Sequence, residues 1–169
     1  MITLGKKYNC TSPFVFDGDT MNLDFQGEIV RVRLQMIDTP ESRKNRQNSD
    51  DPNIVDHWEW AEKAKTALMD LVKGQTIITY PIGRDIFDRL LCDCYIERVT
   101  AKNNIQINLC KSGMAISYLP FNRYSYNSRE LAVIRGIITE TANANRRKTG
   151  IWSNPDFILP NDFKKLTIS

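Results

Sequence analysis

Residues 14–41 read FVFDGDTMNLDFQGEIVRVRLQMIDTPE, and this stretch predicts the centre of the fold. Apolar residues alternate with arginine and glutamine from position 30 to position 36. A period of two is the pattern of a half-buried strand, because successive side chains of a strand point to opposite faces. We therefore expect a strand with one face in a core, paired through a turn at Gln26-Gly27 with the segment before it.

The carboxylates of this stretch stand at its two ends, Asp17 and Asp19 at the start and Asp38 and Glu41 at the finish. Pairing of the strands would bring these ends together, with Arg33 on the polar face beside them. Like charges at short range repel and shift each other's pKa values. A hard divalent cation together with a phosphate relieves that repulsion, so the stretch indicates a metal site that meets a phosphate.

The rest of the chain predicts further short strands and amphipathic helices. Strands are expected at residues 8–16, 21–25, 29–37, 75–82 and 89–96, and helices near residues 56–74, 105–114 and 128–150. Five short strands with a helix between the third and the fourth fit an α+β domain of the OB-fold class, a mainly β five-stranded barrel with about three helices. This domain is expected to span residues 1–153, followed by a loosely attached C-terminal tail over residues 154–169.

Two of the helices carry more detailed expectations. Asp56 is expected to cap the first helix, with Glu59 reaching back in a capping box. Ser128 is expected to cap the third helix, and Gly136 inside it costs about 1 kcal/mol relative to alanine, so its fit must come from packing. The apolar face predicted for the third helix consists of Leu131, Ile134, Ile138 and Ala142.

Length and composition favour one domain of ordinary amino-acid usage. The chain has 169 residues, a net charge of +3 and a pI near 8.7, which permits a polyanionic partner but fits ordinary solubility equally well. No signal peptide or membrane span is predicted, so a cytoplasmic monomer without membrane contacts is expected, unless a leader has been removed.

The cysteines do not form a metal or disulfide pattern. No Cys-x-x-Cys pair occurs, and the single histidine, His57, lies far from every cysteine in the sequence, so neither zinc nor disulfides are expected. Cys92 and Cys94 would share one face of a strand, which leaves a metal or redox pair conceivable, but buried reduced thiols are the preferred interpretation. His57 is interpreted as a structural residue covered by Trp58 or Trp60.

Five short motifs follow one another between residues 14 and 152. They are Asp-Gly-Asp-Thr at 17–20, Arg-Leu-x-x-Ile-Asp-Thr-Pro-Glu at 33–41, Asp-x-aromatic-x-Arg at 85–89, Asn-Leu-x-x-x-Gly-Met-Ala at 108–115 and Gly-Ile-Trp at 150–152. In this order they resemble the staphylococcal nuclease, or thermonuclease-like, family. The resemblance implies a calcium-dependent endonuclease, a phosphodiester hydrolase, that cleaves the bond to the 5′ oxygen in DNA and RNA and leaves 3′-phosphate ends.

The resemblance also implies roles for the acidic residues. Asp19 and Asp38 look like the calcium ligands, with the backbone carbonyl of Thr39 as a third. Asp17 resembles the acid that orients metal-bound water. Glu41 resembles the residue that positions the attacking water, either as general base or as its orienter.

Arg33 and Arg89 resemble the pair of arginines that bind the scissile phosphate. Before Arg89 the chain departs from the family's Tyr-Gly, since Phe87 keeps a face for stacking but lacks the phenol, and Asp88 has to adopt the backbone angle that glycine usually takes. Asp88 also adds an anion beside Arg89, which would weaken phosphate binding or add a metal contact. The candidates for stacking a base are Phe87, Tyr118 and Phe121, with Tyr124 nearby.

Each motif alone also has a simpler interpretation. Residues 17–19 form a common turn sequence, and Arg33 alone would fit a cross-strand ion pair. Taken together, the motifs favour a nuclease that prefers single-stranded substrate, because stacking and phosphate contacts carry little base information. A degenerate member that binds nucleic acid or a protein without cutting is the alternative, and an oligosaccharide-binding or structural barrel is a third interpretation.

Overall fold

The strands predicted from the alternating pattern close into a barrel. The structure is a computed structural model and describes residues 1–45, 47–119 and 125–166. The strands of the barrel follow one another in the order β1-β2-β3-β6-β5. They are β1 (Tyr8–Val15), β2 (Thr20–Phe25), β3 (Glu28–Leu34), β5 (Ile77–Arg84) and β6 (Leu90–Ile96). The predicted α+β architecture, an OB-fold with a five-stranded barrel, is therefore confirmed.

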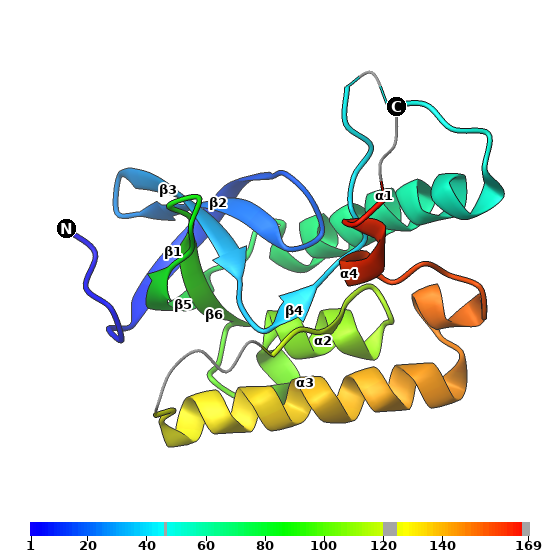
Figure 1. Ribbon diagram of the computed structural model, residues 1–169. Coiled ribbons are helices and arrows are strands. Elements are labelled where there is room, and N and C mark those ends of the chain that lie inside the picture. Colours follow the sequence, from blue (N-terminus) through cyan, green and yellow to red (C-terminus); the bar gives the residue numbers. More distant parts are fainter. Residues whose placement is uncertain (46, 120–124, 167–169) are drawn as a thin grey trace.

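Helices gather on one side of this barrel, with α2 between the barrel and α3 (Figure 1). The helices are α1 (Pro52–Val72), α2 (Ile105–Lys111), α3 (Ser128–Arg147) and the short α4 (Pro160–Phe163), with 3₁₀ turns η1 (Ala101–Asn103) and η2 (Gly150–Ser153). Two further short strands, β4 (Ile37–Asp38) and β7 (Ile116–Ser117), pair with each other beside the barrel. None of the helices in the described part of the chain combines the length and the apolar character that a membrane crossing requires.

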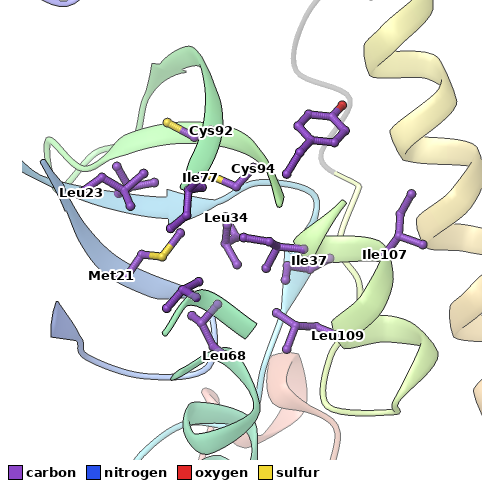
Figure 2. Packing of buried hydrophobic residues seen from close by; sticks show 14 of the residues in the cluster. Met21, Leu23, Leu34, Ile37, Leu68, Ile77, Cys92, Cys94, Ile107 and Leu109 are labelled. Atoms are coloured by element: carbon purple, nitrogen blue, oxygen red, sulfur yellow. The ribbon is translucent and has the colours of Figure 1, made fainter. Parts of the chain in front are cut away.

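The apolar face of the alternating stretch forms the interior of the barrel. Met21 and Leu23 of β2 and Leu34 of β3 are fully buried. Figure 2 shows them packed with Ile77 of β5 and Leu68 of α1. Full burial of each such side chain contributes about 1.5–3 kcal/mol to folding. The four cysteines are free and buried, and all of them belong to this core, which confirms the prediction of reduced thiols.

The strand predicted over residues 29–37 is broken, and the break positions the acidic residues that follow it. Met36 has a φ of 63°, a left-handed conformation that an extended strand does not contain. The chain therefore leaves β3 after Leu34, and β4 turns to pair with β7 instead of continuing in the barrel. Because of this turn, Asp38 lies beside Arg33 and not further along the same strand.

The first helix begins earlier than predicted. Asp51, not Asp56, is its N-cap, and the Asp51 side chain accepts a hydrogen bond of 2.9 Å from the backbone N–H of Asn53. The reason lies in Pro52, whose fixed φ and missing N–H suit the first position of a helix. The capping box predicted from Asp56 and Glu59 is therefore wrong.

The third helix is capped by Asn127, one residue before the predicted Ser128. The side chain of Asn127 accepts from the backbone N–H of Glu130, and the carboxylate of Glu130 accepts from the backbone N–H of Asn127, so a capping box begins this helix. The apolar face is also rotated from the prediction: Leu131 and Ile138 are each 46% exposed. The buried apolar residues of α3 are Val133, Ile134, Ile137 and Ala144.

Packing against α2 explains this rotation. A Cβ atom on Gly136 would overlap the side chain of Ile107, which belongs to α2. The missing side chain at Gly136 therefore lets the two helices approach closely and selects the face that α3 turns inward. The expectation that packing accounts for Gly136 is confirmed.

The tail after Asn154 is packed on the domain, contrary to the prediction of a loosely attached strap. Pro160 and Phe163 of α4 are buried. The ring of Phe163 stacks on His57 of α1 with 3.5 Å between the ring centroids. Contacts of this kind fix the position of the residues that follow, including Lys164.

Gly113 provides a test of how tightly α2 is joined to the chain that follows α3. Gly113 has a φ of +69°, and a Cβ there would overlap the backbone of Thr149. We expect Gly113→Ala to lower the free energy of unfolding by about 2–4 kcal/mol, from the left-handed conformation and the overlap together. Chemical denaturation with urea measures this loss.

Gly74 is the matched control for this variant. It has a φ of +68° but no atom within 4 Å of an added Cβ. Gly74→Ala should therefore lose only about 1 kcal/mol. Equal losses at the two positions would contradict the close approach at Gly113.

Candidate active site

The acidic loop, residues 17–19, rests directly on helix α1 and on the chain after β4. A Cβ on the buried Gly18 would lie 2.8 Å from the Cβ of Ala64 and 2.9 Å from the Cβ of Thr39. Both neighbours are short side chains with little freedom to move, so glycine is required between Asp17 and Asp19. This close contact fixes the position of the backbone that carries Asp17 and Asp19 relative to α1.

Arg33 brings the two predicted metal ligands together. It lies on β3 opposite Thr20, and its Nη2 atom is 3.2 Å from Asp19 Oδ2 and 3.1 Å from Asp38 Oδ1. Nη1 of Arg33 donates to the backbone carbonyls of Leu34 and Ile37, each at 3.2 Å. One guanidinium therefore joins the acidic loop, β3 and β4.

Arg89 reaches the same place from the neighbouring strand. Its side chain is held by Asp85, with Nε 2.8 Å from Asp85 Oδ2, and its Nη1 donates to Thr20 Oγ1 at 3.3 Å. Thr20 Oγ1 in turn donates to Asp19 Oδ1 at 2.9 Å. Burial raises the pKa of Asp85, but its hydrogen bonds with Arg89 outweigh this and lower it, so the pair is charged. Arg89 directly precedes β6, which pairs in parallel with β3, so the two arginines approach Asp19 from neighbouring parts of the barrel.

The two departures before Arg89 are both accommodated. Asp88 has a φ of 61°, which is the glycine-like angle expected from the resemblance. Its carboxylate lies 3.2 Å from Nη1 of Arg84 and is largely exposed, so Asp88 pairs with Arg84 and the anion bound to Arg89 is Asp85. The ring of Phe87 is 72% exposed.

Two adjoining clefts collect the predicted site residues. The first has a volume of about 550 Å³ and is lined by Asp17, Asp19, Arg33, Thr39, Glu41 and Arg89, among others. The second, of about 700 Å³, shares Arg33, Phe87 and Arg89 with the first and includes Tyr118. Phe121 and Tyr124 lie outside the described residues. Phe87 and Tyr118 therefore line one cleft that opens beside the carboxylates.

Lys164 is a site residue that the sequence analysis missed. Its ammonium lies 2.7 Å from both Oδ atoms of Asp38 and 3.2 Å from Oε1 of Glu41. Lys164 follows Asp38 by 126 residues, and no motif or periodicity connects the two positions. Figure 1 shows the reason for their meeting, since α4 lies against the chain that leads from β4 towards α1.

His57 is the second residue whose importance the sequence did not indicate. It is fully buried and stacks on Phe157 and Phe163, not on Trp58 or Trp60 as predicted. Its Nε2 accepts a hydrogen bond of 2.8 Å from the backbone N–H of Glu41. Its Nδ1 lies 2.9 Å from the carbonyl oxygen of Ile158. A neutral imidazole with the proton on Nδ1 satisfies both bonds and joins the Glu41 backbone to the tail.

Burial and neighbouring charges shift the pKa values of Asp17, Arg33 and Asp38. Burial raises the pKa of Asp38 above its usual value, against the lowering effect of Lys164 and Arg33. Burial and the negative charge of Asp19 raise the pKa of Asp17 to about 6. For Arg33, the carboxylates of Asp19 and Asp38 outweigh burial and raise its pKa. Because the carboxylates of this cluster are removed from water and repel one another, an added cation would stabilise their charged forms.

The donor atoms suit a hard cation such as Ca²⁺ or Mg²⁺. Asp19 and Asp38 each place an oxygen within 3.2 Å of the same nitrogen of Arg33, and a lysine ammonium already lies on Asp38. Within residues 1–45, 47–119 and 125–166, no three His, Cys, Asp or Glu side chains form a complete metal cage. A hard cation held by one or two carboxylates, a backbone carbonyl, waters and a substrate phosphate does not need such a cage.

The buried His57 predicts a specific dependence of stability on pH. Burial lowers its pKa from 6.5 to about 4, so between these values the unfolded chain binds the proton that the folded protein excludes. The contribution of His57 to stability should therefore be complete above pH 6.5 and decline as the pH falls towards 4, by on the order of 3 kcal/mol.

The test compares the wild type with His57→Gln in urea unfolding from pH 7 to pH 4. The comparison is needed because the raised pKa values of Asp17 and Asp93, each about 6, produce the opposite slope in both proteins. The difference in unfolding free energy between the two proteins should shrink as the pH falls. A difference that is constant over this range would contradict the buried neutral imidazole.

The amino-acid sequence of this chain is similar to those of known proteins. Residues 31–154 match the family model described as staphylococcal nuclease homologue. An uncharacterized endonuclease of Haemophilus influenzae is 26% identical over 161 residues, covering 95% of this chain and 75% of the relative. Endonuclease YncB of Bacillus subtilis is 27% identical over 161 residues, covering 94% of this chain and 68% of the relative. The SPbeta prophage-derived endonuclease YokF of Bacillus subtilis is 27% identical over 150 residues, covering 87% of this chain and 45% of the relative.

The family match covers most of the chain and includes Arg33, Asp38, Glu41 and Arg89. It agrees with the closed barrel and with the resemblance carried by the five motifs. The chain therefore belongs to the staphylococcal nuclease family.

Proposed function

We propose that this protein is a calcium-dependent endonuclease that hydrolyses DNA and RNA with little sequence specificity and leaves 3′-phosphate ends. The observation that carries the proposal is the contact of Arg33 with both Asp19 and Asp38 in a cleft that also contains Glu41 and Arg89. The family supports a nuclease, and the relatives named above are called endonucleases. The calcium ion, the substrates and the product ends are the proposal.

The ion would be held by Asp19, Asp38 and the carbonyl of Thr39, where it would act as a Lewis acid on the phosphate and neutralise its charge. Asp17, half-buried beside Asp19, would accept a hydrogen bond from water on the ion. Asp17, Asp19 and Thr39 line one cleft, and Arg33 links Asp19 to Asp38, which supports both roles.

The two arginines bind the phosphate oxygens. A guanidinium stays charged and offers a planar pair of donors that matches two oxygens of a phosphate. Arg89 is aimed by its contacts with Asp85 and Thr20, and Arg33 by its contacts with two carboxylates. Donors held in place in this way stabilise the charge of the transition state without having to reorganise.

Glu41 accepts a hydrogen bond from the attacking water. Its backbone is fixed by His57, and its side chain lines the cleft and remains one-third exposed, enough to meet a water molecule. After attack on phosphorus, the bond to the 5′ oxygen breaks and the phosphate stays on the 3′ oxygen. Orienting or deprotonating the water contributes about 10²–10⁴ in rate in comparable enzymes.

The second cleft suits a nucleobase. Phe87 and Tyr118 are exposed aromatic residues that line it beside both arginines. Stacking on an aromatic ring accepts any base but requires the base to be free of its partner strand. We therefore expect single-stranded substrate to be preferred and sequence to matter little.

A binding module that grips nucleic acid without cutting it is the second candidate. One observation favours it, namely that Lys164 lies on both Asp38 and Glu41, where it leaves neither carboxylate free. Cleavage assays separate the two candidates.

Incubation with single-stranded DNA and with plasmid DNA tests the proposed activity. Cleavage should appear with Ca²⁺ and stop with a calcium chelator, and single-stranded DNA should disappear first. The products should not prime a DNA polymerase until a phosphatase has removed their 3′ phosphates. A gel shift without cleavage in Ca²⁺ would support the binding module instead.

Two variants test the chemical roles at single residues. Arg89→Ala removes a positioned phosphate donor and should lower kcat by about 10²–10³-fold. Glu41→Gln keeps the shape of the side chain but removes its charge, and should lower kcat by at least about 10²-fold. Arg146→Ala on the exposed surface of α3 is the control and should behave as wild type. Rates near wild type in the first two variants, with folding confirmed by circular dichroism, would contradict these roles.

A further inference from the structure

The C-terminal segment, residues 154–166, is attached to α1 by contacts that do not involve Lys164. Phe163 is 5% exposed and its ring lies nearly parallel to that of His57, at an angle of 3°. The Ile158 carbonyl lies 2.9 Å from Nδ1 of His57, and the Asn154 side chain donates to Asp56 at 2.9 Å. These contacts keep Lys164 beside the site whether or not its own ion pairs are made.

The ammonium of Lys164 takes up the oxygens that a metal ion would need. Both Oδ atoms of Asp38 accept from it at 2.7 Å, and Oδ1 also accepts from Arg33 at 3.1 Å. Oε1 of Glu41 is 3.2 Å from the same ammonium. Each carboxylate oxygen of Asp38 therefore has a cationic partner. The Asp38 side chain is 2% exposed, so water has little access to it.

Lys164 is charged in this position. Burial lowers its pKa, but the hydrogen bonds and charges of Asp38 and Glu41 outweigh burial and raise the pKa above 10.5. An ammonium is a compact cation on a flexible stem, so it fills a cation site without the fixed geometry of a guanidinium. Its side chain is 41% exposed, so solvent adjoins the position that the ammonium occupies.

We propose that Lys164 is a built-in competitor of the divalent cation, which occupies Asp38 and Glu41 until the metal ion displaces it. This inference rests on the proposed metal-dependent function of the same site. In the exchange, the divalent cation takes the oxygens of Asp38 and the ammonium returns to solvent at the cleft edge. Because both cations use the same carboxylate, binding of one must weaken binding of the other. Lys164 itself lies beyond residues 31–154, the range that the family model covers.

The competition sets the concentration of metal ion at which the site fills. Lys164 is tethered beside Asp38, so its local concentration does not change with the solution. Removing the competing charge should tighten metal binding by about tenfold, within the 5- to 150-fold range of typical couplings between sites. A lysine that served only to stabilise the fold would have no such effect on metal affinity.

Isothermal titration of Ca²⁺ into wild type, Lys164→Gln and Lys165→Gln tests the proposal. Lys165 is the matched control, because it neighbours Lys164 and carries the same charge but pairs with Asp162 at 2.8 Å. We expect a Kd about tenfold lower for Lys164→Gln than for wild type, and no change for Lys165→Gln. Asp38→Asn should lose binding, which identifies the site being titrated.

The outcomes separate this proposal from the proposed function. Binding with equal Kd in wild type and Lys164→Gln would overturn the competition and leave the metal-dependent nuclease standing. Weaker binding in Lys164→Gln would also overturn it, since Lys164 would then assist the metal. An equal gain in both lysine variants would show an effect of net charge only and overturn it. Absence of Ca²⁺ binding in every protein would overturn both the proposal and the calcium-dependent function.

Discussion

The contact of Arg33 with Asp19 and Asp38 joins parts of the chain that the barrel alone does not hold together. Asp19 precedes β2, Arg33 lies on β3, and Asp38 ends β4. All three charged groups are largely buried, and a buried charge is tolerated only with a partner of opposite sign and satisfied hydrogen bonds. The folded protein therefore has to bring the two carboxylates to one point. The same requirement creates the place where a cation and a phosphate can be bound.

The remaining parts of the site are arranged around this point by the barrel and by α1. The parallel pairing of β3 with β6 brings Arg89, the residue before β6, into the cleft that Arg33 lines. The close approach of Gly18 to Ala64 seats the acidic loop on α1. His57 on α1 then fixes Glu41 and binds the tail with the same imidazole. Arg33, Arg89, Asp19 and the backbone of Glu41 are thus held by contacts within the protein, which is the condition for a preorganised site.

The sequence predicted the barrel well because its signals are local. Alternation along residues 30–36 identified β3, and the turn residues Gln26 and Gly27 both have positive φ, as a tight hairpin requires. It failed where a tertiary contact overrides a local pattern. Met36 interrupts the predicted strand because β4 pairs with β7, and α3 is rotated because Gly136 packs on Ile107. The cap of α1 differs for a local reason, since Pro52 is the first residue of the helix and makes Asp51, not Asp56, its N-cap.

By itself, the sequence determined the fold class, the family and the chemical types of the candidate site, because alternation and short motifs are properties of neighbouring residues. Only the tertiary structure decided which charges meet. Lys164 contacts Asp38, which lies 126 residues earlier in the chain. His57 joins Glu41 to the carbonyl of Ile158 in the tail, 101 residues after His57. Packing between distant segments creates both contacts. Such contacts depend on the burial of Phe163 against α1, a fact of three-dimensional packing that no spacing in the sequence records.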